Sequence, residues 1–121
     1  MITMADIHIR VSMNGLIRES ANIVIAQAAK INHCSKGDVL GKHKYANFVN
    51  ARRMISAVLL KHEWGLSKIA RLLGRNHATI IHHRERHNYF MQNESDYKAK
   101  YNELYEAMQG YSFGSPKNIA V

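Results

Sequence analysis

Apolar residues recur along most of this chain every three or four positions, which places their side chains on one face of an α-helix. This spacing predicts helices at about residues 18–31, 47–62, 66–73, 77–91 and 94–109, with one further helical turn near 36–40. The sequence therefore predicts an all-α fold of five to six helices.

Glycine and asparagine mark the boundaries between the central helices. Gly65 breaks the second long helix, and Gly74 stands just past the next one, where a left-handed residue often ends a helix. Asn76 is of a type that caps helix N-termini, and it directly precedes the helix at 77–91.

The two ends of the chain follow other patterns. Residues 6–13, DIHIRVSM, alternate apolar and polar positions, as in a short strand, and the turn signal Asn14-Gly15 follows. We therefore expect an N-terminal arm at 1–17, one folded domain at 18–109 and a mobile tail at 110–121.

Composition is compatible with one domain that has a real core. Hydrophobic residues make up 46% of the chain, and no apolar run reaches the ~18 residues that a membrane helix needs. The first residues lack the apolar segment and cleavage site of a signal peptide. Cys34 is the only cysteine, which suits a reducing cytoplasm.

The charge of the chain says more about its binding partners than its overall composition does. The chain carries a net charge of +8, and residues 42–87 hold ten basic and two acidic residues, which equals that whole excess. A basic block of this kind is typical of a surface that binds a polyanion, although a solvated basic face would look the same.

The short helix at 66–73, a brief turn and the basic helix at 77–91 form a helix-turn-helix pattern. In that motif the second helix enters the major groove and its first residues reach the base edges. Arginine and asparagine are the side chains that pair bidentately with guanine and adenine. The expected base contacts are Arg75, Asn76, His77, Ala78 and Thr79.

The stretch ARRMISAVLLKHEWGLSKIARLLGRNHATIIHHRERH resembles the C-terminal DNA-binding domain of the bacterial replication initiator DnaA. The family's Gly-Arg-Asp-His-Thr-Thr-Val-x-His signature corresponds to residues 74–82 here, and the resemblance covers about residues 20–108. It implies a Trp-repressor-like helix-turn-helix that binds a short asymmetric duplex site as a monomer.

The resemblance also implies contacts beyond the first turn of the recognition helix. A basic loop corresponds to Lys42, His43 and Lys44. The side chains expected at the DNA backbone or in the minor groove are Lys42, His43, Lys44, Arg52, Arg53, Lys68, Arg71 and His82.

This chain departs from the family pattern at several of these positions. The family places a minor-groove arginine one position before a proline, where Asn50 and Ala51 stand here, so that contact is either lost or shifted to Arg52. Asn76 replaces an aspartate and could pair with adenine, and Ala78 replaces a threonine.

His83 and His87 replace residues that are apolar in the family and lie on one helical stripe with Ile80 and Phe90. Their i, i+4 spacing could hold a metal ion, but Glu85 between them does not match the HExxH order. We expect both histidines to turn inward, with hydrogen bonds that satisfy them, and we expect no metal site.

Several kinds of chemistry have no motif in this chain. The GxxxxGK[ST] phosphate-binding sequence is missing, and with it the ATPase domain of the full initiator, so we expect no nucleotide and no cofactor. Neither a catalytic triad nor a carboxylate pair stands out, so an enzyme is not expected.

The sequence thus predicts a stand-alone, cytoplasmic and nucleoid-associated protein that binds double-stranded DNA, in control of replication initiation or of transcription. It predicts no membrane association and allows a protein partner in replication control. The alternative is a partner-binding adaptor that keeps the fold but has lost base-specific readout.

Overall fold

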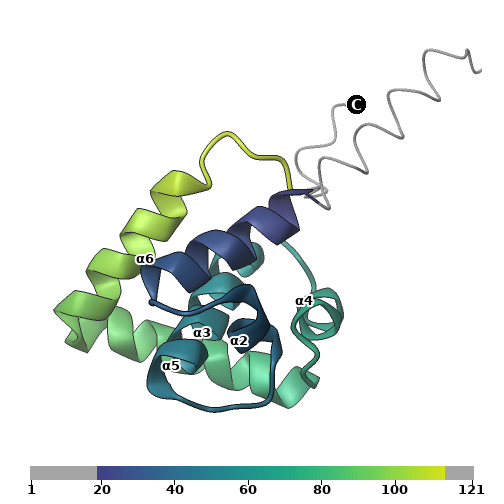
Figure 1. Ribbon diagram of the computed structural model, residues 1–121, viewed down its shortest axis with the longest axis horizontal. Coiled ribbons are helices and arrows are strands. Elements are labelled where there is room, and N and C mark those ends of the chain that lie inside the picture. Colours follow the sequence, from purple (N-terminus) through teal and green to yellow (C-terminus); the bar gives the residue numbers. More distant parts are fainter. Residues whose placement is uncertain (1–18, 114–121) are drawn as a thin grey trace, which may run out of the picture.

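The computed structural model describes residues 19–113, and within this range it contains helices and no strand. A first helix covers residues 19–31. Five more follow (Figure 1): α2 Lys36–Leu40, α3 Ala46–Lys61, α4 Leu66–Leu73, α5 His77–Asn93 and α6 Ser95–Ala107. The all-α fold is thus confirmed for the described part of the chain. None of its helices combines the length and apolar character needed to cross a bilayer.

Local side-chain chemistry sets several helix ends. Ser35 and Asp38 form a reciprocal capping box at α2, with hydrogen bonds of 3.0 and 2.9 Å. Gly74 ends α4 with a φ of 65°, a left-handed conformation that glycine adopts without steric cost. The predicted stop at Gly74 and the predicted cap at Asn76 are both confirmed.

Helix α3 lies at the centre of the domain, in contact with α2, α4, α5 and α6. Every residue from 51 to 59 on this helix is buried, so α3 has no solvent-exposed face along its middle two and a half turns. The sequence predicted a single apolar stripe, which holds for Ile55 and Val58 but misses the burial of Arg52 and Arg53.

The inner stripes of α5 and α6 complete this core. Ile80, His83 and His87 are buried on α5, as predicted. On α6 the buried residues are Tyr97, Tyr101 and Leu104. The two helices therefore meet α3 with a mixed aromatic and imidazole surface instead of a purely aliphatic one.

The chain stays folded beyond the predicted end of the domain. Phe113 is fully buried, its ring stacks on His62 with centroids 4.3 Å apart, and its carbonyl accepts a 2.7 Å hydrogen bond from the Trp64 indole. The prediction of a mobile tail from residue 110 is wrong up to Phe113, because this aromatic anchor joins the core. The predicted arm at 1–17, including the strand at 6–13, lies outside the described residues.

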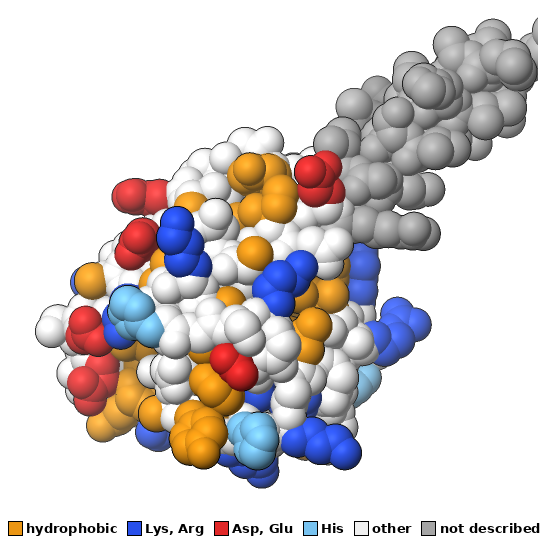
Figure 2. Space-filling model, viewed as in Figure 1, with side chains coloured by type: hydrophobic (Ala, Val, Ile, Leu, Met, Phe, Trp, Pro, Cys, Tyr) orange, Lys and Arg blue, Asp and Glu red, His pale blue; other side chains and the backbone are white. Residues whose placement is uncertain are grey.

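Charge is distributed unevenly over the surface. Figure 2 shows most of the carboxylates along the left edge, on the side of α6, which carries Asp96, Glu103 and Glu106. Lysine and arginine side chains project mainly from the lower and right edges of the same view. On the face shown, the acidic and basic side chains are therefore largely separated.

Candidate nucleic-acid interface

Helices α4 and α5 are joined by the three residues Gly74, Arg75 and Asn76. The Arg75 backbone N–H donates to the Ala70 carbonyl at 2.8 Å, which closes the end of α4 in a Schellman-type turn. The turn is short, and α4 and α5 pack against each other. This arrangement has the element order of the predicted helix-turn-helix.

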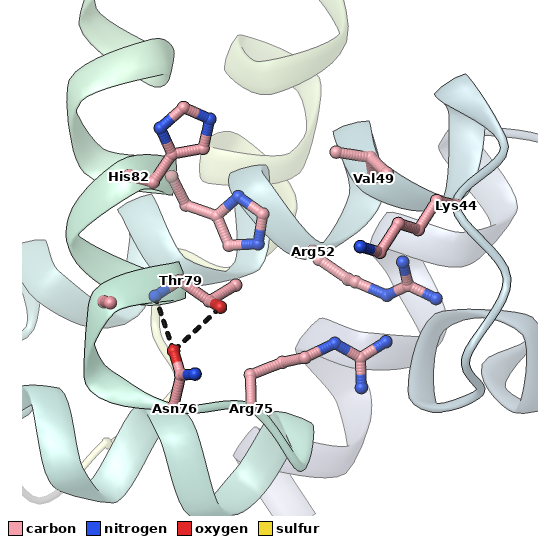
Figure 3. A pocket seen from close by; sticks show the side chains of 9 residues that line it. Lys44, Val49, Arg52, Arg75, Asn76, Thr79 and His82 are labelled. Atoms are coloured by element: carbon pink, nitrogen blue, oxygen red, sulfur yellow. Dashed lines mark hydrogen bonds between the residues drawn. The ribbon is translucent and has the colours of Figure 1, made fainter.

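The Asn76 side chain caps α5 and is largely occupied by that role. Its Oδ1 accepts from the Thr79 backbone N–H and from the Thr79 hydroxyl, both at 2.9 Å (Figure 3). These two bonds use both lone pairs of the amide oxygen. Bidentate pairing with adenine would need that oxygen, so it would require the cap to open.

Arg75 turns back from the start of α5 toward the end of α2. Its guanidinium donates to the carbonyls of Leu73 at 3.0 Å and Gly74 at 3.4 Å, and it also hydrogen-bonds the Gly41 carbonyl. The side chain is half-buried. Of the five predicted base contacts, Arg75 is the one that the structure turns inward.

Arg52 is a structural residue, contrary to its predicted place at the DNA. It is 2% exposed, and its guanidinium donates to the carbonyls of Val39 at 2.6 Å, Asp38 at 2.9 Å and Gly41 at 2.9 Å. These bonds tie the end of α2 to α3. Burial, followed by the nearby charge of Arg75, lowers the pKa of Arg52.

Arg53 is also buried, at 7% exposure, and its predicted role at the DNA is corrected for the same reason. Its guanidinium donates to Asn50 Oδ1 at 2.7 Å and lies 4.6 Å from the centroid of the Phe90 ring. Both arginines face other helices because α3 is covered on all sides.

Thr79 is half-buried, and the remaining predicted contacts are exposed. His77 and Ala78 open α5, and the His77 Nε2 lies 2.8 Å from the Ser67 hydroxyl oxygen. Lys68 is exposed on α4 and lies 4.0 Å from the Trp64 ring centroid. The other exposed cationic or imidazole side chains of the predicted set are Lys42, His43, Lys44, Arg71 and His82.

A surface hollow of about 540 Å³ brings part of this set together (Figure 3). It lies between the loop before α3, the first two turns of α3 and the first two turns of α5. Its lining residues are Lys44, Val49, Arg52, Arg75, Asn76, Ala78, Thr79, His82 and His83. We call this site the cationic hollow. Lys42, His43, Lys68 and Arg71 do not line it.

Val49 and His83 are the two lining residues that sequence reasoning did not connect with the DNA-facing residues, and His83 is the polar one. Its i, i+4 spacing from Thr79 was the available signal, since residues four apart lie on one helical face. The inward direction of both histidines is confirmed, at 5% exposure for His83 and 8% for His87.

The two buried histidines differ in their hydrogen bonding. His87 Nδ1 lies 2.7 Å from the Tyr97 hydroxyl, so its predicted satisfaction is confirmed. Both ring nitrogens of His83 are buried without a hydrogen-bond partner, so the same prediction is wrong for His83. Burial, with the nearby positive charges second, lowers the pKa of each ring to about 4.

No group of three or more His, Cys, Asp or Glu side chains in residues 19–113 is arranged to hold a metal ion. Comparison with protein-family models, curated proteins and solved structures gave no significant match to the chain. The resemblance to the initiator domain therefore stays a prediction, based on the signature residues quoted above.

Proposed function

We propose that the chain binds double-stranded DNA in a sequence-specific way, with α5 in the major groove of a Trp-repressor-like helix-turn-helix. The observation that carries the proposal is the exposed start of α5 at His77 and Ala78, with exposed cations both on the loop before α3 and on α4, which packs against α5. Lys42 and Lys44 precede α3, and Lys68 and Arg71 lie on α4. Such a protein would associate with the nucleoid and act in replication initiation or transcription.

The charge around this turn supports the proposal. The sequence has no Asp or Glu between Asp38 and Glu63, and none between Glu63 and Glu85. An approaching phosphate backbone would meet several cations along these stretches and few carboxylates. Because Arg52 is buried, four exposed cations remain as phosphate contacts, and these predict a slope of log K against log salt of about −3.6.

Selection from a pool of randomised duplexes tests the proposal directly. We expect an enriched motif, and we expect Lys68→Ala to weaken binding to all sequences alike. His77→Ala should instead change preference at one base pair, since His77 is exposed at the start of α5. Lys98→Ala removes an exposed lysine from α6 and serves as the matched control.

One observation favours a second candidate, a partner-binding adaptor without base readout. Arg75 is bonded to backbone carbonyls and the Asn76 oxygen is used by the cap, so two of the best base-reading groups are occupied. The adaptor predicts no enriched motif at modest salt. A motif that is enriched and then lost in His77→Ala would exclude the adaptor.

A further inference from the structure

The unpartnered imidazole of His83 points to a ligand in the cationic hollow. Only 5% of the His83 surface is exposed, and neither ring nitrogen has a hydrogen-bond partner. A buried polar group without a partner lowers stability, because no hydrogen bond compensates for its loss of water. Since His83 lines the hollow, a molecule bound there could hydrogen-bond a group that the protein leaves unsatisfied.

The lining shows which chemistry this molecule should have. Lys44, Arg52 and Arg75 all line the hollow, and no Asp or Glu does. The guanidiniums of Arg52 and Arg75 converge on one acceptor, the Gly41 carbonyl. Figure 3 shows both guanidiniums directed to the same side, with the Lys44 side chain close to that of Arg52. Positive charge is thus concentrated without a protein carboxylate among the lining residues.

The helix that forms one wall adds to this potential. Asn76, Ala78 and Thr79 belong to the first turn of the 17-residue helix α5, whose dipole makes its N-terminus positive. Backbone N–H groups of such a turn favour anions. The cationic side chains, the positive end of α5 and the unpartnered imidazole of His83 therefore all favour an anion.

We propose that the cationic hollow binds a tetrahedral oxyanion of the phosphate class, with Lys44 and Arg75 as cationic donors and His83 as the buried donor. One source of that anion is a backbone phosphate of the bound duplex, and for this source the inference rests on the proposed function. The other source is a free phosphate or a small phosphorylated molecule. Binding should favour the protonated His83, so a proton is taken up from solvent onto the free ring nitrogen.

The charges that face His83 set the direction of this coupling. Arg52 and Arg53 from α3, Arg75 from the turn and His82 from α5 all lower the pKa of His83, and burial lowers it most. An anion in the hollow would offset these positive charges. The pKa of His83 should then rise from about 4 toward the ordinary value of about 6.5.

Titration of inorganic phosphate into the full chain tests the proposal, with chloride at matched ionic strength as the reference. The ring resonances of His83 in an NMR spectrum should shift saturably, and the midpoint of the His83 pH titration should rise by at least one unit. Lys44→Ala should weaken phosphate binding about tenfold, whereas Lys36→Ala, which removes an exposed lysine outside the hollow, should leave it unchanged. Phosphate that fails to shift the His83 resonances would overturn the proposal, as would equal weakening by the two lysine variants.

His83→Leu is the second variant, because leucine matches an apolar inner-face position. It should fold, as judged by its circular dichroism, and should lose the proton uptake that accompanies phosphate binding. If the folded variant takes up protons as the original chain does, His83 is not the coupled group and the proposal fails. This readout does not depend on how strongly Lys44→Ala affects stability.

A duplex carrying the selected motif separates the two sources of phosphate. If both the duplex and free phosphate shift His83 and compete, the hollow takes a backbone phosphate. If phosphate shifts His83 while no duplex binds, the proposed function fails and the anion site stands with a small phosphorylated ligand. If the duplex binds and neither ligand affects His83, the anion site fails and the proposed function stands.

Discussion

The two neighbouring arginines of α3 lie in different environments of the same core. The two buried histidines of α5, one turn apart, differ in the same way. Arg52 and His83 both line the cationic hollow, where the arginine binds backbone carbonyls and the histidine has no partner. Arg53 and His87 lie in an aromatic cluster, formed with Phe90, Tyr97 and Tyr101.

In the aromatic cluster the imidazole of His87 finds its hydrogen-bond partner within the protein, although the Tyr101 hydroxyl and Arg53 Nε are buried there without one. The His87 ring lies 4.4 Å from the Tyr101 centroid, and its Nδ1 meets the Tyr97 hydroxyl. Arg53 lies over the Phe90 ring, an arrangement worth roughly 0.5–2 kcal/mol. The comparison shows that residues of the same type can find or lack a hydrogen-bond partner in one core, depending on what packs against them.

The largest expected effect is the dependence of stability on pH. The pKa of each buried histidine is about 4 in the folded protein and about 6.5 when unfolded, so the unfolded state binds protons more readily. The contribution of the two histidines to the free energy of unfolding should therefore be fully present above pH 6.5. It should be lost as the pH falls from 6.5 to 4, by about 3 kcal/mol for each histidine.

Urea denaturation at a series of pH values measures this fall. His83→Leu and His87→Leu should each remove about half of it. Added phosphate should reduce the His83 part and leave the His87 part, because only His83 lines the hollow. A pH dependence that both variants leave intact would assign the effect to other groups.

The same substitution at the two arginines should have unequal effects. Arg52→Met removes three hydrogen bonds to carbonyls and should lower the free energy of unfolding by about 3 kcal/mol. Arg53→Met removes one hydrogen bond and the contact with Phe90, and it also removes a buried Nε without a partner. We expect it to cost about 1 kcal/mol. Equal losses in urea denaturation would contradict this difference.

Two tyrosines test the hydrogen bonding of the aromatic cluster. Tyr97→Phe should lower the free energy of unfolding by about 1–2 kcal/mol, because it leaves His87 Nδ1 without its partner. Tyr101→Phe is the matched control, since the Tyr101 hydroxyl is buried without a partner and its removal should be neutral or stabilising. Thermal unfolding of both variants at pH 7.5 gives the comparison, and a larger loss in Tyr101→Phe would refute it.

The smallest effect concerns the two asparagines at the ends of α5. Asn76→Ala removes the N-cap next to the hollow and should cost about 1 kcal/mol. Asn93→Ala at the opposite end removes an exposed hydrogen bond to the Tyr89 carbonyl, which water can replace, so its cost should be close to zero. Urea denaturation of the two variants shows whether the N-cap of α5, next to the hollow, contributes to the stability of the fold.

Local signals in the sequence were sufficient to predict the helices of residues 19–113 and the inward faces of α4 and α5. Helical spacing and two end signals, Gly74 and Asn76, were enough to predict α4 at Leu66–Leu73 and the start of α5 at His77. Both signals act within a few residues of the chain. The inward direction of His83 and His87 was predicted from their helical stripe with Ile80 and Phe90, and from the apolar residues that the resemblance places at these two positions.

What lies opposite each of those faces depends on contacts between segments that are far apart in the sequence. Periodicity identifies one buried face, but α3 is covered on every side, and this coverage placed Arg52 and Arg53 in the core. Phe113 joined the core through Trp64, a contact between residues 49 positions apart. The cationic hollow likewise combines Lys44 with the first turns of α5, and whether His83 finds a partner there depends on the packing of segments that are distant in sequence.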